Sequence, residues 1–488
     1  MKGRFPLSIG LLVLLTLGSA ESRPSSHGQK MKPLDIGSNL ELFVDDYLIE
    51  SMKGVRLQLQ EARPAGTVLE FDKPWEGTTS LYHTVFKDGD LYRMYYRGSS
   101  HAGYTFPKFV GPGETVIPEH EEVACYVESR DGITWTRPSL GLIEFEGSKD
   151  NNIVWIGRGS HNFAPFKDGN PEADPAQPYK ALAGGPLLAL ASTDGIRWTK
   201  IQEEPVISDG AFDSLNVPFW DPVRQLYVAI YRDFTDGVRS MKCATSEDFI
   251  HWTKGEWADY GDAPREHFYT NATQPYFRAP QIYLAFPKRF VPWRTYHDNA
   301  AGAGVSDAVF MTSRDGVHWD RRFGEAFIRP GRDPKNWVHR TNMVSSGVVP
   351  TGDDEISLYV ARHYTSPSAH LERMTVRMDG FASLRADYQG GEMVTKPFVF
   401  KGDDLVLNFS TSAAGSIRIE VQDMHGHPVP GFALEDSPLV FGDEVEHTVK
   451  WDRGHPKARR DTLNRIAGKP VRLRIVMRDA DLYSLRFR

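Results

Sequence analysis

The stretch SRDGVHW at residues 313–319 is one of four near copies of a seven-residue turn. The other copies are SRDGITW from residue 129, STDGIRW from residue 192 and SEDFIHW from residue 246. In this pattern the Asp side chain can accept backbone N–H bonds, the Gly can adopt a positive φ, and the Trp can pack between sheets. None of this needs a substrate. We therefore predict structural roles for the four aspartates, Asp131, Asp194, Asp248 and Asp315.

The spacing of these turns predicts a repeated β-sheet unit. The tryptophans that end them, Trp135, Trp198, Trp252 and Trp319, are 63, 54 and 67 residues apart, the length of a four-stranded unit with its loops. Between the turns run segments rich in aromatic and β-branched residues, such as LYRMYYRG at 91–98. A fifth copy at 377–381 has lost its Trp. We therefore predict an all-β fold with a five-bladed β-propeller over residues 34–390.

The sequence pattern changes after residue 390, where the repeated turns stop. Segments such as SIRIEVQD and PVRLRIVM alternate apolar and polar residues and are joined by Gly, Pro and Asp turns. This pattern predicts an antiparallel β-sandwich over residues 391–488. We expect an accessory domain that braces the propeller, with carbohydrate binding as the alternative.

The turns, preceded by strands such as VFMTSRDG, resemble the five-bladed propeller of glycoside hydrolase families 32 and 43, the invertase-like and arabinanase-like enzymes. The resemblance covers residues from about 40 to 390, and the C-terminal region resembles the sandwich of the invertase-like enzymes. It implies hydrolysis of glycosidic bonds in a poly- or oligosaccharide. The chain departs from the invertase pattern, because it lacks the N-terminal W-M-N-D-P-N-G motif and the later Glu-Cys pair. Substrate and stereochemistry therefore stay open.

The first 20 residues predict an export signal. Lys2 and Arg4 precede an apolar run, and small residues follow it at 18–20. We expect cleavage there, a flexible tail at 21–33 and a periplasmic or extracellular protein without a membrane span. The net charge of −7 and the absence of a Lys/Arg run argue against a nucleic-acid partner. Cys125 and Cys243 occupy similar places in non-adjacent repeats, so we predict two buried thiols.

In a propeller the first strand of each blade faces the central tunnel, so site residues should come from the five first strands. Those segments begin near residues 80, 161, 213, 270 and 340 and are unusually polar. Their imidazole, amide and guanidinium groups suit sugar hydroxyls. The substrate-binding candidates are His83, His161, Asn162, Asn216, Arg265, His267, Asn271, Gln274, Arg340 and Asn342. No motif for a metal or cofactor is present, and we predict none.

Glycoside hydrolysis needs one protonated and one ionised carboxyl group. Asp213 and Glu266 begin neighbouring first strands, and we expect them to meet across one wall of the tunnel mouth. Asp45 and Asp46 form an acidic pair inside an apolar strand, where burial needs a reason. The order Asp, Asp, Glu resembles that of the propeller glycosidases. It implies Asp46 as base or nucleophile, Asp213 as stabilising aspartate and Glu266 as general acid.

Two functional readings therefore stand. The first is a secreted, monomeric glycoside hydrolase; the alternative is a non-catalytic carbohydrate-binding propeller module. Paired carboxylates facing each other in the tunnel would favour the enzyme, and a single carboxylate would favour binding. The string GRDP at 331–334 matches an invertase motif but falls late in the blade order, so we predict that Asp333 is a loop residue.

Overall fold

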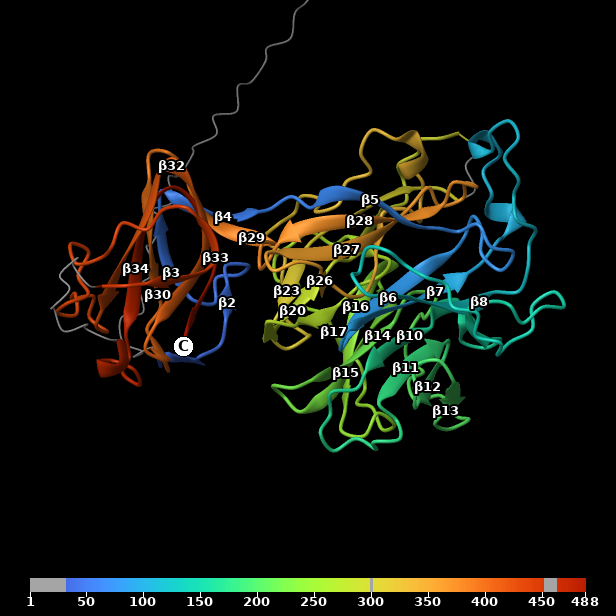
Figure 1. Cartoon of the computed structure of the whole chain (residues 1–488), viewed down its shortest axis with the longest axis horizontal. Helices are drawn as coiled ribbons and strands as arrows, with labels where there is room; N and C mark the ends of the chain where they lie inside the picture. The colour runs from blue at the N-terminus through green and yellow to red at the C-terminus, as the bar shows by residue number, and fades with distance from the viewer. Residues whose placement is uncertain (1–31, 299–301, 452–462) are drawn as a thin grey trace, which may run out of the picture.

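The computed structural model describes residues 32–298, 302–451 and 463–488 (Figure 1). Within these ranges the regular structure is β-strand, apart from five one-turn 3-10 segments at Ala102–Tyr104, Pro107–Phe109, Ser160–Asn162, Pro334–Asn336 and Leu463–Arg465. The predicted all-β class is confirmed. The predicted export signal and nearly all of the predicted tail lie outside the described residues.

Three four-stranded antiparallel sheets follow one another along the chain, each with its strands in sequence order. The first contains β6 (Leu81–Asp88), β7 (Leu91–Gly98), β8 (Val123–Ser129) and β9 (Ile153–Ile156). The second contains β10 (Ala164–Lys167), β11 (Tyr179–Gly184), β12 (Leu187–Ser192) and β13 (Trp198–Lys200). The third contains β14 (Val217–Asp221), β15 (Leu226–Thr235), β16 (Val238–Ser246) and β17 (Glu256–Trp257).

The fourth repeat is divided into two sheets by breaks within its strands. One sheet contains β19 (Gln274–Tyr276), β20 (Ala279–Ala285), β23 (Met311–Ser313) and β24 (Trp319–Asp320). The other contains β18 (His267–Phe268), β21 (Lys288–Val291) and β22 (Val305–Ala308). Only two residues separate β20 from β21 and β22 from β23, so the two sheets are successive halves of one unit.

The fifth sheet joins the two ends of the repeated region. It contains β25 (Met343–Val344), β26 (Val349–Pro350), β27 (Glu355–Arg362), β28 (His370–Arg377) and β5 (Arg63–Glu70). Its outermost strand, β5, precedes the first sheet in sequence and pairs antiparallel with β28. Main-chain hydrogen bonds thus tie the last repeat to the segment that leads into the first.

The first strands of the five repeats lie side by side around a centre, and we call β6, β10, β14, β19 and β25–β26 the inner strands. β10 contacts both β6 and β14, β14 contacts β19, and β26 contacts β6. The side chain of Gln274 completes the circuit by accepting the backbone N–H of Val348 at 3.1 Å. The inner strands therefore form a closed ring.

The repeated turns have the hydrogen bonds that the sequence predicts. In the last copy the hydroxyl of Ser313 accepts the N–H of Gly316 at 2.9 Å, and one carboxylate oxygen of Asp315 accepts two N–H groups, each at 2.8 Å. The other three copies repeat these contacts. Phe249, which replaces the Gly in one copy, keeps a φ of 70°. The structural interpretation of the four aspartates is confirmed by these contacts.

Replacing Asp315 with Ala removes the acceptor of two backbone N–H groups in a turn. We expect the free energy of unfolding to fall by about 1–3 kcal/mol, with turnover per folded molecule unchanged. Thermal melting and an active-site-independent measure of folded protein check this. A variant with normal melting but no turnover would contradict a structural role.

Figure 1 shows two lobes, with the five repeats on the right and the C-terminal strands on the left. The remaining strands form an eight-stranded sheet and a parallel pair. The sheet contains β2 (Glu41–Leu42), β3 (Ile49–Lys53), β4 (Val55–Leu59), β29 (Ala382–Ala386), β30 (Gly391–Thr395), β32 (Leu405–Gln422), β33 (Asp443–Val449) and β34 (Arg472–Phe487). The parallel pair is β1 (Leu34–Gly37) with β31 (Phe398–Phe400). Strands at 34–59 and 382–386 therefore pair within the C-terminal unit, and the boundaries predicted at 34 and 390 are corrected.

The physical reason for this correction is a long-range apolar contact. Ile36, Phe43 and Leu48 are buried in the same core as Phe398 and Leu485. Such burial is set by which sheet offers an apolar face, and the local alternation of a short strand does not reveal its partner. The N-terminal segment consequently braces the C-terminal unit before the chain enters the ring.

The degraded fifth turn joins the two lobes through a buried carboxylate. Asp379 accepts the hydroxyl of Tyr276 at 2.6 Å, and it also accepts hydrogen bonds from Asn408 at 3.1 Å and Ser484 at 2.8 Å. The first partner lies in the fourth repeat and the other two lie in the C-terminal sheet. In this copy of the turn the Asp side chain therefore makes contacts between the repeats and the C-terminal sheet.

Both cysteines, Cys125 and Cys243, are buried and unpaired, as predicted. Across the described ranges, the structure contains no helix with the length and apolar character needed to cross a membrane.

Candidate active site

The carboxylate of Asp213, just before β14, receives contacts from three other repeats. The Nε2 atom of His161 lies 2.9 Å from its Oδ1 atom. The hydroxyl of Tyr82 donates to Oδ1 at 3.3 Å, and the hydroxyl of Tyr269 donates to Oδ2 at 3.1 Å. The Asp213 side chain is nevertheless 56% exposed. A carboxylate held from several sides and still open to solvent is available to a ligand.

A second carboxylate lies behind the imidazole. The Oε2 atom of Glu122, just before β8, is 2.7 Å from Nδ1 of His161. Its other oxygen is 3.4 Å from the buried guanidinium of Arg97. One imidazole ring thus connects two carboxylates, those of Asp213 and Glu122, and we call these three residues the Asp–His–Glu triad.

The triad holds its charges in a defined pattern. Burial opposes ionisation of both carboxyl groups, but the hydrogen bonds to His161 and the charges of His161 and nearby arginines together outweigh it. They lower the pKa of Glu122 to about 2 and the pKa of Asp213 well below its usual range. Burial also opposes protonation of the imidazole, yet its bonds to Asp213 and Glu122 raise the pKa of His161. Each ring nitrogen of His161 faces an ionised carboxylate, so the triad favours the imidazolium form, which has an N–H for each of them.

Arg340 brings the fifth repeat to the same place. Its guanidinium lies 5.8 Å from the ring centre of Tyr269 and 4.8 Å from that of Tyr104, and its charge helps to lower the pKa of Asp213. Each repeat thus contributes one residue at or just before its inner strand: Tyr82, His161, Asp213, Tyr269 and Arg340. The closed ring of inner strands positions the cluster.

Four predicted substrate-binding asparagines support this arrangement from below the surface. Asn162 and Asn216 both donate to the carbonyl of Phe212, at 2.7 and 3.1 Å, and so fix the backbone next to Asp213. Asn271 donates to the carbonyl of Ile230 at 3.0 Å, and Asn342 to that of Ser306 at 2.8 Å. All four are buried. These amides are engaged with backbone and position the strands.

The other predicted binding residues lie outside the cluster. His83 is buried between Phe71 and Tyr96, with ring centres 5.5 and 5.6 Å away, and burial together with the charge of Arg97 lowers its pKa to about 3. Arg265 is exposed and pairs with Asp236. The Nδ1 atom of His267 accepts the backbone N–H of Arg239 at 3.3 Å, and the carboxamide of Gln274 bonds Val348 across the inner ring.

Glu266 and Asp46 each belong to a different contact set from Asp213. The Glu266 carboxylate lies 2.5 Å from Arg321 and 3.3 Å from Arg289. Glu266 and Tyr269 lie on either side of the short strand β18 (His267–Phe268), and only Tyr269 contacts Asp213. The structure brings neither Glu266 nor Asp46 into contact with Asp213.

Asp46 lies between β2 and β3, where the chain pairs with the C-terminal sheet. Its side chain is 67% exposed and 3.4 Å from Arg322. The neighbouring Asp45 pairs with Arg314 at 2.9 Å, which gives the buried member of the acidic pair its partner. The loop residue Asp333 caps a 3-10 segment by accepting the N–H of Lys335, as its predicted loop position allows.

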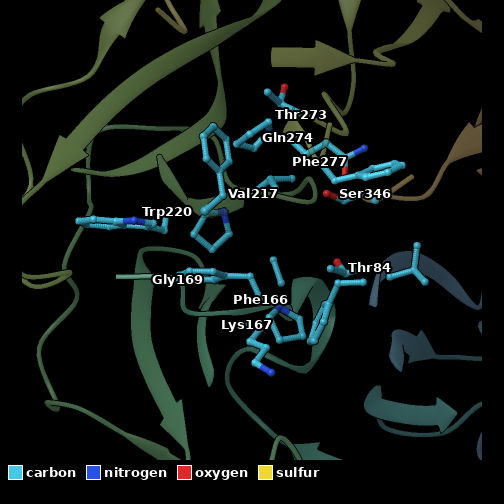
Figure 2. Close-up of a pocket in the computed structure, with 18 of the residues that line it drawn as sticks. Thr84, Phe166, Lys167, Gly169, Val217, Trp220, Thr273, Gln274, Phe277 and Ser346 are labelled. Atoms are coloured by element: carbon cyan, nitrogen blue, oxygen red, sulfur yellow. The ribbon is translucent and has the colours of Figure 1, made fainter. Parts of the chain in front are cut away.

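A cavity of about 560 Å³ opens at the other end of the inner strands (Figure 2). It is lined by residues of β6, β10, β14 and β19, among them Thr84, Phe166, Trp220 and Gln274, and by Ser346 between β25 and β26. Of the charged side chains at its wall, Lys167 contacts Asp88, Asp168 contacts the buried Lys180, and Lys87 lies over the ring of Tyr92. The open titratable groups converge instead at Asp213, which makes that carboxylate the candidate centre for chemistry.

Several residues of the cluster lie outside the sequence prediction. Tyr82 and Tyr269 stand in the inner-strand segments, where an aromatic hydroxyl near a carboxylate candidate is a usable signal. Glu122 directly precedes β8, the third strand of its sheet, and Arg97 is the next-to-last residue of β7, the second strand. Nothing local marks those two, because they contact His161 from 39 and 64 positions away in the sequence.

Comparison with known proteins gives resemblance in structure only. No protein-family model matches the chain, and no curated protein matches it. Similar solved structures include a glycoside hydrolase (13% identity, 64% of this chain and 92% of that one, TM-score 0.42). Two others are the β-1,2-mannobiose phosphorylase of Listeria innocua (11%, 67% and 98%, 0.41) and the catalytic domain of a Coprinopsis cinerea family 62 α-L-arabinofuranosidase (9%, 66% and 98%, 0.40).

Proposed function

We propose that this chain is a glycoside hydrolase whose reaction takes place at Asp213. The observation that carries the proposal is the Asp–His–Glu triad: an exposed ionised carboxylate and a protonated imidazole, 2.9 Å apart, at the mouth of a ring of inner strands. Glycosidic cleavage requires one group that holds a proton and one that does not. The triad contains both at the same pH.

Each residue of the site has a separate role in the proposed reaction. Asp213 accepts the proton of the attacking water, and His161 gives up its hydrogen bond to Asp213 and donates its Nε2 proton to the departing oxygen. Glu122 keeps the imidazole protonated. In the water reaction, hydroxide joins the sugar and one proton passes to Asp213; return of that proton to His161 restores the triad. Tyr82 and Tyr269 orient the carboxylate through their hydroxyl groups.

The wider proposal concerns the whole chain. We propose that the five repeats are the blades of one propeller, that the C-terminal unit is a sandwich that braces it, and that an export signal at 1–20 directs the monomer out of the cytoplasm. The closed ring of inner strands supports the first point, and the interdomain contacts of Asp379 support the second. The predicted kinship with glycoside hydrolase families 32 and 43 is part of this proposal.

A panel of aryl glycosides and polysaccharides, assayed by release of reducing sugar, tests the activity. We expect wild-type protein to release sugar from at least one substrate and the Asp213→Asn variant to release none above background. The alternative, a carbohydrate-binding propeller, is favoured by the ion pairs of Glu266 with Arg289 and Arg321, because they engage the carboxylate that was expected to face Asp213. Tight binding without any release by the wild type would select that alternative.

The pH dependence of the reaction follows from the triad. Because His161 has a pKa raised above its usual value of 6.5 and must be protonated to act, kcat/KM should stay high below that value and fall as pH rises through the raised pKa. On the acid side Glu122 stays ionised until about pH 2, so it sets no limit at mild pH. A profile between pH 4 and 10 measures this. Activity that rises with pH across the same range would contradict the proton assignment.

A further inference from the structure

Four cationic side chains surround the ring of Tyr269, the residue whose hydroxyl bonds Asp213. Measured to the ring centre, Lys288 lies at 4.1 Å, Arg232 at 4.9 Å, Arg239 at 5.4 Å and Arg340 at 5.8 Å. They come from the third repeat, the fourth repeat and the segment before β25. We call these four side chains the cation cluster.

The cation cluster lacks counter-ions. Among the described residues, none of the four has a carboxylate within ion-pair distance, whereas most other buried cations of this chain are paired. Each also has a buried nitrogen without a hydrogen-bond partner: Nζ of Lys288, Nη1 of Arg232, and Nε of both Arg239 and Arg340. Lys288 is fully buried and Arg232 is only 5% exposed.

Such an arrangement is unfavourable for an empty site. Cations that are removed from water and left unpaired lose hydration, and four of them around one ring repel each other. Asp213, whose charge acts on Lys288, is already hydrogen-bonded to His161, and Glu122 is engaged by His161 and Arg97. The repulsion is visible at Lys288, whose pKa burial and the three arginines lower well below its usual range. The cation cluster is therefore complementary to a ligand that carries negative charge.

We propose that the cation cluster is a subsite for the oxoanion group of an acidic sugar, a uronic acid carboxylate or a sulfate ester, placed next to the bond that Asp213 and His161 cleave. This inference rests on the proposed function. Tyr269 connects the two sites, because its hydroxyl holds Asp213 while its ring is flanked by the cations. One sugar unit can therefore present its anion to the cluster and its anomeric carbon to Asp213.

Calorimetric binding to the full chain tests the subsite without relying on turnover. The probes are glucuronate and galacturonate, their methyl esters, a sulfated monosaccharide, the neutral sugars and inorganic phosphate. We expect at least one acidic sugar to bind about tenfold or more tightly than its uncharged counterpart, as one charge-assisted contact allows. Equal affinity for the charged and uncharged forms of a sugar would overturn the proposal. It would also be overturned if inorganic phosphate were the only probe that bound.

Variants locate the effect. In Lys288→Met and Arg239→Gln the preference for the charged form should fall about tenfold or more. The matched control is Arg478→Gln, because Arg478 also lies over a tyrosine ring, that of Tyr388 at 4.3 Å, but in the C-terminal sheet. Melting curves establish folding; if Lys288→Met does not fold, the half-buried Arg239 carries the test. An unchanged preference in folded Arg239→Gln would overturn the assignment.

Proton uptake gives a second readout. An anion that enters the cluster offsets the charges facing Lys288, which are Arg232, Arg239, Arg340, His339 and the opposing Asp213. Binding should therefore raise the pKa of Lys288, so that protons are taken up at a pH between its values in the free and bound forms. A pH series of calorimetric titrations measures this uptake as a heat that depends on the ionisation enthalpy of the buffer. Binding of an acidic sugar with no buffer dependence would contradict the role given to Lys288.

The two proposals fail separately. Tight binding of an acidic sugar without cleavage would remove the hydrolase assignment and leave the subsite. Cleavage of neutral glycosides with no advantage for acidic ones would leave the hydrolase and remove the subsite.

Discussion

Replacing Asp213 with Asn is expected to lower kcat/KM by about 10²- to 10⁴-fold, the range that a positioned proton-transfer group contributes. The amide keeps the volume of the side chain and one oxygen that Tyr82 can reach, but it can neither accept a proton from water nor attack the anomeric carbon. Initial rates on the best substrate of the panel, normalised to folded protein, measure the loss.

The melting temperature of Asp213→Asn separates chemistry from folding. Asp213 is more than half exposed and carries no backbone hydrogen bond of its own among its described contacts, so the variant should fold normally. The hydroxyl variant Tyr269→Phe is a useful companion, since it frees the carboxylate without removing it and should cost much less. Full activity in Asp213→Asn would exclude this carboxylate from the reaction.

Glu122→Gln and Glu266→Gln should behave differently, although both remove one carboxylate. Glu122→Gln deletes the ionised partner of His161 and should lower kcat/KM on the order of 10- to 100-fold, the equivalent of one hydrogen bond to a charged group. It should also move the alkaline fall of the pH profile to lower pH, because one cause of the raised His161 pKa is gone.

Glu266→Gln serves as the contrasting variant. Its carboxylate neutralises Arg289 and Arg321, so the expected effect is a lower melting temperature with turnover preserved in the folded fraction. Loss of turnover in a stable Glu266→Gln protein, together with normal turnover in Glu122→Gln, would restore Glu266 as the general acid and remove the triad.

The repeated turns made the architecture readable from sequence because each turn is local: a Ser, an Asp and three backbone N–H groups within six residues. The same repeat placed the inner strands, and with them His161, Asp213 and Arg340. Position in the repeat was therefore a better guide to the site than residue type. Asn162 and Asn271 have the residue type and the position expected of sugar-binding residues, but their side-chain amides donate to backbone carbonyls.

The site residues that the sequence analysis did not identify are brought together by contacts between segments far apart in the sequence. Glu122 reaches His161 over 39 positions, and Lys288 meets Arg340 around the ring of Tyr269. No local pattern encodes such pairings. The short strands at 34–59 were misplaced for the same reason, because their apolar residues fit any sheet with an open face.

A crystal structure of the Asp213→Asn variant with an oligosaccharide bound tests the central claim most directly. The account predicts a sugar unit within hydrogen-bonding distance of residue 213 and His161, at the beginnings of the inner strands. A sugar seated instead in the cavity between Phe166 and Trp220, with the Asp–His–Glu triad free, would contradict it.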